Sequence, residues 1–407
     1  MINQDVFSNF KTLWVGLSGG LDSTVLLHLL SSYPELKPKL KAIHVNHGIS
    51  DNADAWQMHV QQFCQTHHIP LVVERINLRG LSNLEATARE ARYRIFQDYV
   101  KPDDALVLAH HQDDQVETLL LHLFRGAGVE GLSGMRERTT LFNCQVVRPL
   151  LAISRETLLQ YARTSGLTWI EDESNTDVSL KRNFLRHEII PRLKLQWPNV
   201  VDKIAMTAGH CQQASDNLYD LAVIDRLPSP TAVGEGLGVR ELLTYSEARR
   251  TNLLRSWFKS LDIRPPTQAV MNQVLALCEA KVDAMPKVKV GEYFVHRYQG
   301  ALYIEPPLPK KLAPIAWENY PSPLVIDELQ MTIEGIYDVP PGAKVSIRFR
   351  EGGETIRANG QEKSLKTLMQ AWKIPPWRRH LVPLVYVDDR LVGVKYHQSH
   401  DRKGVLR

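Results

Sequence analysis

Cysteine is scarce in this sequence and follows no pattern. The 407 residues include four cysteines and no CxxC pair: Cys64, Cys144, Cys211 and Cys278. This spacing fits neither a disulfide framework nor a zinc site. A long chain without a disulfide framework is typical of the cytoplasm, and we expect the protein there.

Long hydrophobic runs are also missing. No stretch approaches the roughly 18 consecutive apolar residues of a membrane-spanning helix, and residues 1–5 show no signal-peptide pattern. We therefore expect no membrane partner. Hydrophobic residues make up 43% of the chain and charged residues 23%, as in ordinary globular proteins. The length favours roughly two to four domains.

A strong net charge is the third absence, since the total is only +4. The charge is nevertheless uneven. Residues 341–407 hold 14 Lys and Arg against 6 Asp and Glu, a net +8, so the preceding residues together carry −4. A basic C-terminal module favours a polyanionic partner, although a solvated charged surface would have the same composition.

The sequence also lacks a Walker A lysine motif and a G-x-G-x-x-G turn, yet it has a glycine-containing turn after its first strand-like run. This turn, Ser18-Gly19-Gly20-Leu21-Asp22-Ser23, separates apolar residues 13–17 from the helix-like residues 24–30. Backbone N–H groups and the dipole at such a helix start bind anions. Asp22 would repel a phosphate unless a divalent cation lay between them. The turn therefore predicts a nucleotide with Mg²⁺, and the alternative is an ordinary capped turn.

Strand-like and helix-like segments alternate along the first 150 residues. Further strands are expected at 40–45, 69–73 and 105–109, and helices at 54–67, 83–100 and 113–124. This order predicts an α/β fold with a parallel sheet, helices on both faces and ligands at the carboxyl edge.

Two polar clusters follow strands at that edge: His44–Gly48 and His110–Thr118. In a helix that starts near Gln112, Asp113 and Glu117 lie on one face. Acids in a first helical turn are often only dipole partners. Two histidines and three acids exceed that need, so we expect the second cluster to hold Mg²⁺ and a cationic or protic substrate.

The turn resembles the pyrophosphate loop (PP-loop) of the N-type ATP pyrophosphatases, and an ordered set of further motifs resembles one family among them, the tRNA(Ile)-lysidine synthetases. The motifs are N-H-G at Asn46–Gly48, E-x-x-A-R-x-x-R-Y at Glu85–Tyr93, A-H-H-x-D-D-Q-x-E-T at Ala109–Thr118, R-G-A-G at Arg125–Gly128, R-P-L-L at Arg148–Leu151, E-D-E-S-N at Glu171–Asn175 and R-N-F-L-R at Arg182–Arg186. The match covers most of residues 13–193, and a block near the C-terminus also fits.

The resemblance, together with the composition along the chain, predicts four regions. They are an adenine nucleotide alpha-hydrolase-like catalytic domain (1–200), a helical middle domain (201–306), a Pro-rich linker (307–325) and a small α+β tRNA-binding domain (326–407). It implies a ligase that adenylates O2 of the wobble cytidine of a CAU-anticodon tRNA(Ile). The amine of L-lysine then attacks C2 and releases AMP. A homodimer is compatible with the family.

The resemblance and the strand-edge positions together give the expected site residues. Expected to bind ATP are Ser18, Gly19, Gly20, Leu21, Asp22, Ser23, His44 and Asn46. Expected to bind Mg²⁺ are Asp22 and Asp114. Expected to hold lysine and remove its proton are His111, Asp113 and Glu117, with Arg125 stabilising the adenylate. Expected to bind tRNA are Arg182, Arg186, Arg348, Arg350, Lys363, Lys366, Arg378 and Arg379.

Two other functions remain open from the sequence. A tRNA thiolase shares the PP-loop but needs reactive cysteines or an iron–sulfur site, which these cysteine spacings do not favour. A non-catalytic tRNA-binding protein would leave the loop and the acids unexplained.

Overall fold

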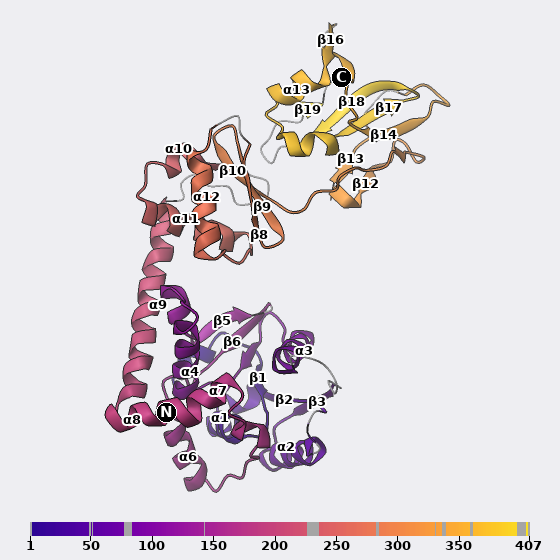
Figure 1. The fold of residues 1–407 in the computed structure, drawn as a ribbon. Coiled ribbons are helices and arrows are strands. Elements are labelled where there is room, and N and C mark those ends of the chain that lie inside the picture. Colours follow the sequence, from indigo (N-terminus) through magenta and orange to yellow (C-terminus); the bar gives the residue numbers. More distant parts are fainter. Residues whose placement is uncertain are drawn as a thin grey trace. The chain divides into compact units, whose positions relative to one another are not determined.

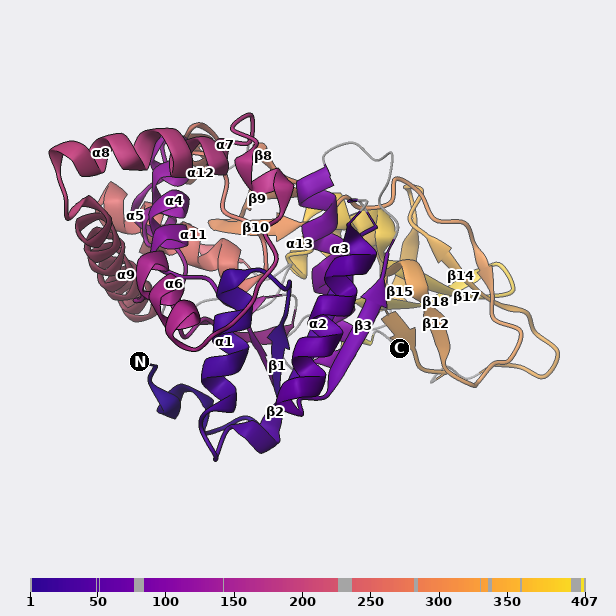
Figure 2. The ribbon, with the colours of Figure 1, turned by 90° about the horizontal axis from the view of Figure 1, so that it is seen from below.

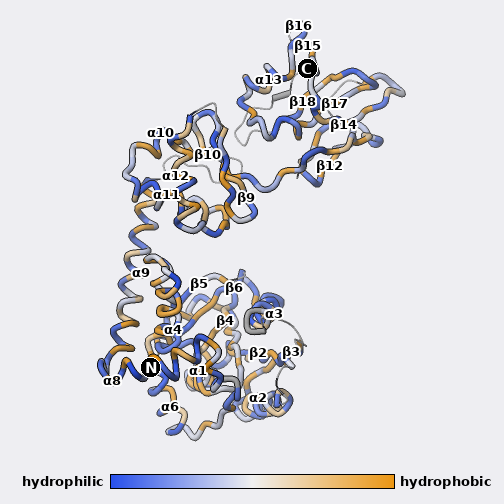
Figure 3. Tube along the Cα trace, viewed as in Figure 1, coloured by the Kyte–Doolittle hydropathy of each residue, from blue (hydrophilic) through white to orange (hydrophobic). Residues whose placement is uncertain are grey.

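The computed structural model describes residues 2–48, 50, 52–76, 84–141, 143–225, 236–281, 285–329, 331–335, 339–358, 361–396 and 404–405. The chain divides into two compact units, Met1–Asn217 and Leu218–Arg407. The division falls within the long helix α9 (Val200–Asp225) (Figure 1). Hydrophobic and hydrophilic segments alternate along the trace of both units (Figure 3). None of the helices in the described ranges is long and apolar enough to cross a membrane.

Unit 1 is built on a six-stranded sheet in the order β3-β2-β1-β4-β6-β5. Neighbouring strands are parallel except β5 and β6, which pair antiparallel. The strands are β1 (Leu13–Gly16), β2 (Leu40–Asn46), β3 (Leu71–Arg75), β4 (Ala105–Val107), β5 (Arg138–Leu141) and β6 (Cys144–Val147). The predicted parallel sheet is confirmed.

Helices cover both faces of this sheet. Alternate residues of β1 join different apolar clusters: Val15 packs with α1, α2 and α6, whereas Trp14 packs with α3. Figure 2 shows α2 beside β3. The helices of unit 1 are α1 (Leu21–Ser31), α2 (Ala53–His67), α3 (Leu84–Tyr99), α4 (Gln112–Leu123), α5 (Val129–Leu132), α6 (Arg155–Thr164), α7 (Lys181–Phe184), α8 (Ile190–Gln196) and the first part of α9. The predicted start of α3 at Asn83 lies outside the described residues.

The carboxyl ends of β1, β2 and β4 lie at one edge of the sheet because the three strands are parallel. The glycine turn follows β1, His47 follows β2, and His110 and His111 follow β4. A parallel bridge pairs His111 with Leu150, which ties the start of α4 to the segment after β6. The topology thus gathers the predicted clusters at one edge.

Unit 2 contains two lobes with separate cores. The middle lobe, residues 236–305, was expected to be mainly helical, but it combines helices with a four-stranded antiparallel sheet, β7-β10-β9-β8. The β-rich part has alternating residues such as Lys287-Val288-Lys289-Val290, in which Val290 is buried and Lys289 exposed. Its elements are β7 (Leu237–Gly238), α10 (Val239–Leu242), α11 (Glu247–Ser260), α12 (Gln268–Glu279), β8 (Lys287–Val290), β9 (Tyr293–Tyr298) and β10 (Ala301–Glu305).

The C-terminal lobe, residues 312–396, is mainly β-structure. A five-stranded sheet runs in the order β11-β14-β17-β18-β19, and two hairpins, β12-β13 and β15-β16, add to it. Its elements are β11 (Ile315–Ala316), β12 (Leu324–Ile326), β13 (Met331–Ile333), β14 (Val345–Phe349), β15 (Thr355–Ala358), β16 (Gln361–Ser364), α13 (Leu365–Ala371), β17 (Pro383–Val387) and β18 (Arg390–Tyr396), with β19 (Gly404–Val405) after the lobe.

The predicted Pro-rich linker contains residues that pack into the core of the C-terminal lobe. Trp317 is 3% exposed and donates its indole N–H to the carbonyl of Ser322 at 2.8 Å. Ile315 joins the same core as Ile347. Proline spacing alone did not reveal this packing, which involves the buried Trp317 and the partly buried Ile315.

Candidate active site

The turn after β1 is held in shape by its own serines. The Ser23 hydroxyl accepts the backbone N–H of Ser18 at 3.2 Å and lies 3.0 Å from the Ser18 hydroxyl. The Ser18 hydroxyl in turn accepts the N–H of Gly20 at 3.3 Å. Leu21 is buried and anchors the start of α1. The turn is therefore folded ahead of any ligand, with the first N–H groups of α1 at its centre.

Gly19 is required by the geometry of this turn. Its φ is +89°, and a Cβ there would lie 2.6 Å from Cδ1 of Ile170 and 3.0 Å from Cγ2 of Val60. The carbonyl of Gly19 also accepts the N–H of Ile170 at 2.9 Å, so the turn is fixed to the segment after α6. Only glycine combines this backbone angle with this closeness.

His111 lies at the centre of a cluster of carboxylates. It is 1% exposed, and its Nε2 lies 3.5 Å from an oxygen of Asp22 and 3.5 Å from an oxygen of Asp114. Its Nδ1 lies 3.7 Å from Asp113. The Asp113 carboxylate accepts the backbone N–H of Arg155 at 2.8 Å, which fixes its orientation. The structure thus joins the turn after β1 to the start of α4 through one imidazole.

The charges of this cluster support one another. Burial alone would lower the pKa of His111, but the surrounding Asp22, Asp114 and Asp113 raise it above its usual value. Burial alone would raise the pKa of Asp22, but His111, Arg155 and Arg186 lower it. Asp22 and His111 therefore each favour the charged form of the other.

Glu117 is the most enclosed acid of the site. It is 0% exposed, and its Oε1 accepts the Nε–H of Arg186 at 2.7 Å, while Oε2 is buried with no hydrogen-bond partner. Arg186 also donates to Asp114 at 3.2 Å. Burial raises the pKa of Glu117 despite the ion pair with Arg186. Glu117 therefore has one oxygen engaged by Arg186 and one buried oxygen without a hydrogen-bond partner.

His110 and His111 are adjacent in sequence, yet they face opposite charges. Burial, together with repulsion from Arg148, Arg89, Arg182 and Arg92, lowers the pKa of His110 to about 3. His110 is therefore neutral at physiological pH, whereas His111 lies among acids. The structure divides their roles in a way that the sequence did not.

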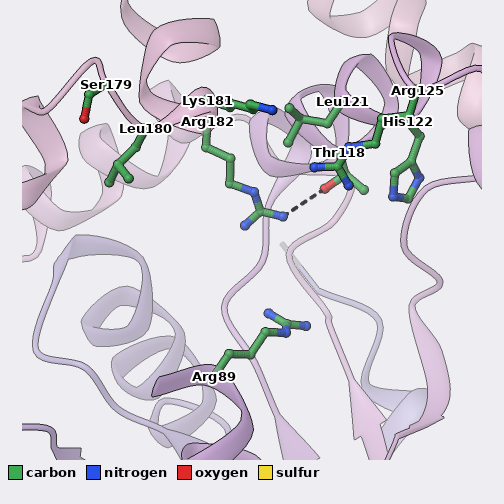
Figure 4. A pocket seen from close by; sticks show the side chains of 9 residues that line it. All are labelled: Arg89, Thr118, Leu121, His122, Arg125, Ser179, Leu180, Lys181 and Arg182. Carbon is green, nitrogen blue, oxygen red and sulfur yellow. Dashed lines mark hydrogen bonds between the residues drawn. The ribbon is translucent and has the colours of Figure 1, made fainter. Parts of the chain in front are cut away.

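A basic pocket of about 380 Å³ lies beside the acidic cluster. Arg89 and Arg182 point into it from opposite sides, and Arg182 donates to the Thr118 hydroxyl at 3.4 Å (Figure 4). The lining includes four cationic side chains and no acidic one: Arg89, Thr118, Leu121, His122, Arg125, Ser179, Leu180, Lys181 and Arg182. Since α4 supplies Glu117 to the acidic cluster and Thr118 to this pocket, the two sites adjoin along one helix.

Arg182 and Arg186, both expected to bind tRNA, contact neighbouring residues of α4. Arg182 lies in the basic pocket, whereas Arg186 binds Glu117 and Asp114. Between them α7 passes into a π-helical turn, Leu185–Ile189, which widens the helix and turns Arg186 away from the α-helical direction. The bonded Arg186 is a partner of the site carboxylates in this structure.

His44 and Asn46, expected to bind ATP, are engaged within the fold. His44 Nδ1 lies 2.8 Å from the carbonyl of Leu17, and Asn46 donates to Gln57 at 3.1 Å and accepts the N–H of Gly48 at 3.0 Å. Both side chains are 5% exposed. They support the loops around the turn rather than presenting a free polar surface.

Most of the predicted tRNA-binding cations of the C-terminal lobe also have partners. Arg348 stacks on Tyr386 and binds Asp389 at 2.8 Å, and Arg350 lies 3.5 Å from Glu354. Arg378 and Arg379 contact the middle lobe, as described below. Lys363 and Lys366 form no ion pair within the described ranges, and Lys366 is exposed.

Sequence reasoning missed Arg89 and Lys181 as lining residues. Arg89 lies in the E-x-x-A-R motif, and Lys181 directly precedes Arg182. Both are basic residues next to recognised motifs, so their charge could have marked them. Their convergence on one pocket depends on the packing of α3, α4 and α7, which local spacing does not give.

The donor set fits one Mg²⁺ at the turn, although the described residues include no group of three or more His, Cys, Asp or Glu that could hold a metal by themselves. Oδ1 of Asp22 is buried and has no hydrogen-bond partner. Mg²⁺ usually takes one or two carboxylates and completes its shell with phosphate oxygens and water. Asp22 offers such a carboxylate oxygen, whereas the Asp114 oxygens accept the backbone N–H of His111 and a guanidinium N–H of Arg186.

Comparisons with known proteins agree with the fold of the chain. A model described as a PP-loop domain matches residues 2–193, a TilS substrate binding domain matches 237–303, and a TilS substrate C-terminal domain matches 345–400. With its parallel sheet and the turn at Ser18–Ser23, the chain is a PP-loop protein.

Full-length relatives define the family. The tRNA(Ile)-lysidine synthase of Legionella pneumophila (strain Paris) is 43% identical over 395 residues, covering 95% of this chain and 91% of that protein. Those of Enterobacter sp. (strain 638) and Shigella flexneri are each 38% identical and cover 97% and 96% of this chain, and 94% and 93% of their own lengths. The chain belongs to the tRNA(Ile)-lysidine synthase family.

Proposed function

We propose that this protein forms lysidine at the wobble cytidine of the CAU-anticodon tRNA(Ile), with ATP and L-lysine as the other substrates. The cytidine O2 attacks the α-phosphorus of ATP and pyrophosphate leaves. The ε-amine of lysine then attacks C2, AMP leaves, and the amine loses a proton. The supporting observation is that α4 contributes residues both to the acidic cluster around His111 and to the basic pocket.

ATP would bind at the turn Ser18–Ser23. Its phosphates would meet the N–H groups at the start of α1 and the hydroxyls that already order the turn. Asp22 and Asp114 would hold Mg²⁺, which when bound neutralises charge on the phosphates. Asp22 is kept ionised by His111, which suits a metal ligand.

The cytidine and its phosphate would enter the basic pocket. The lining residues include four cations and no acid: Arg89, Arg125, Lys181 and Arg182. A bound phosphodiester would neutralise the repulsion among these cations. The Leu121 and Leu180 side chains give the pocket an apolar part for an unstacked base. Arg125 would stabilise the adenylate from this side.

Lysine would bind on the acidic side of α4. Asp113 and Glu117 offer carboxylates, and the unpaired Oε2 of Glu117 is available to take a proton from the attacking amine. The raised pKa of Glu117 makes it a stronger base than an exposed glutamate. His111 would hold the acids in place rather than remove the proton itself.

The decisive experiment supplies ATP, Mg²⁺ and radiolabelled lysine, with and without the CAU-anticodon tRNA(Ile). Acid-stable label on that tRNA, with one AMP released per lysine, is the expected result. AMP release without lysine transfer would retain the ATP chemistry and overturn the second substrate. A methionine tRNA with the same anticodon is the matched control and should stay unlabelled.

The cysteines do not favour a thiolase. Cys64, Cys144 and Cys278 are buried, and burial raises the pKa of the Cys64 thiol to about 12. A protein that acts on tRNA with ATP would work in the cytoplasm, and we assign it there. The homodimer stays a prediction of the resemblance.

A further inference from the structure

The turn Pro376–Leu381, here called the anchor turn, connects the C-terminal lobe to the sheet of the middle lobe. Trp377 stacks on His296 of β9, with ring centroids 4.2 Å apart and planes at 17°. The edges of Tyr298 and Tyr303 complete its surroundings at 5.7 and 6.0 Å. The indole therefore sits among aromatic side chains of β9 and β10.

A buried ion pair lies next to this stack. Glu305, at the end of β10, is 1% exposed, and it accepts Nη2–H of Arg378 at 2.7 Å and the indole N–H of Trp377 at 3.3 Å. Arg379 donates to the Tyr298 hydroxyl at 3.1 Å. Both oxygens of a middle-lobe carboxylate are thus satisfied by C-terminal-lobe donors.

These contacts require the two lobes to stay in one arrangement. Separating the lobes would break the ion pair of Glu305 with Arg378 and its hydrogen bond with the indole N–H of Trp377. The guanidinium of Arg378 is used in this pair. The basic sequence Trp377-Arg378-Arg379 predicts contact with RNA, whereas in the structure Nη2 of Arg378 binds a carboxylate of the middle lobe.

We propose that Glu305, Trp377 and Arg378 are positioning residues for tRNA, which act by fixing the C-terminal lobe to the middle lobe and so fixing where Lys363 and Lys366 meet the RNA. This proposal rests on the proposed function only in that tRNA is the substrate. The three residues contact one another and the middle lobe, and their effect on tRNA is indirect.

The test compares Arg378→Ala with Lys366→Ala in the full chain, measuring KM for tRNA, KM for ATP and kcat at several salt concentrations. We expect Arg378→Ala to raise KM for tRNA about tenfold with kcat and KM for ATP nearly unchanged. Its plot of log KM against log salt should keep the wild-type slope. Lys366→Ala should lower that slope by about 0.7 to 0.9, as the loss of one phosphate contact does.

A double-mutant cycle with Glu305→Gln separates the pair from general damage. Because the two residues act together, Glu305→Gln with Arg378→Ala should raise KM for tRNA no more than either change alone. Additive effects, an unchanged KM, or a salt slope that falls as in Lys366→Ala would each overturn the proposal.

Failure of the proposed function gives a different result. A wild-type chain without tRNA-dependent turnover would refute the lysidine reaction. The contact could still be tested by measuring the thermal unfolding midpoints of the full chains in the double-mutant cycle of Glu305→Gln and Arg378→Ala. Only a coupled pair gives changes in the midpoint that are not additive. Trp377→Phe, which keeps the stack and loses the N–H, should lie between wild type and Arg378→Ala in both measurements.

Discussion

The pKa values of two carboxylates in this site shift in opposite directions, because their burial and their charged neighbours differ. Burial raises the pKa of Glu117, and the ion pair with Arg186 offsets this rise only in part. One oxygen of Glu117 has no hydrogen-bond partner. Asp22, at the turn, is held ionised by His111. Two carboxylates whose pKa values move in opposite directions are suited to different steps, one as a base and one as a metal ligand.

Glu117→Gln tests the base directly. The amide keeps the shape but cannot take a proton, so we expect lysine transfer to fall by about 100-fold or more while ATP–pyrophosphate exchange with tRNA stays near wild type. In the wild type the transfer rate should decline on acidification at a pH above the usual glutamate range, because a raised pKa protonates Glu117 earlier. The same change at the exposed Glu156 is the control. Equal loss of exchange and transfer would assign Glu117 to structure.

Gly19→Ala tests the turn. The new Cβ would contact Ile170 at 2.6 Å with φ at +89°, so the turn must move away from the start of α1. We expect KM for ATP to rise about tenfold or more, with backbone strain of about 1–3 kcal/mol. Gly166→Ala is the matched control. Gly166 also has a positive φ, +64°, but nothing lies within 4 Å of the position that its Cβ would take. An ATP KM that rises equally in both variants would show that the clash has no special role.

At the scale of elements, the alternating segments of the first 150 residues were enough to predict the sheet, because parallel strands have continuous apolar runs and short turns. Side-chain directions beyond the helix starts were not predictable. Arg186 was predicted to bind tRNA, and its contacts with Glu117 and Asp114 across the π-helical turn after Phe184 were not predictable from its sequence neighbours. Arg378 was predicted to bind RNA. Its acid partner, Glu305, was not predicted, because it lies 73 residues away in sequence.

The basic pocket is a property of three elements together. Arg89 comes from α3, Thr118 from α4 and Arg182 from α7. Arg89→Gln or Arg182→Gln should lower kcat/KM for tRNA by about tenfold to 100-fold, since each removes one cation from a site that holds a phosphate. The KM for ATP should not change. Arg94→Gln, also on α3 but exposed and paired with Glu90, is the control. A larger effect of either pocket variant on ATP than on tRNA would place the nucleotide there instead.

For the whole molecule, the separation of charge along the chain predicts two different responses to salt. The last 67 residues carry +8, and the rest carries −4. A long-range attraction to RNA is screened within about 10 Å at 0.1 M salt, whereas contacts within the enclosed turn are screened less. Affinity for tRNA should therefore depend on salt far more than affinity for ATP does.

Lys363→Ala with Lys366→Ala tests this at the lobe where we expect RNA contact. Raising salt from 50 to 200 mM should increase the wild-type KM for tRNA by at least about tenfold and leave the KM for ATP within about twofold. The double variant should lower the salt slope for tRNA by about 1.4 to 1.8, which is two phosphate contacts. Lys37→Ala with Lys39→Ala, a pair from unit 1, should leave the slope unchanged. If that control pair lowered the slope as much, the attraction would be a property of net charge and the C-terminal lobe would have no separate part in holding tRNA.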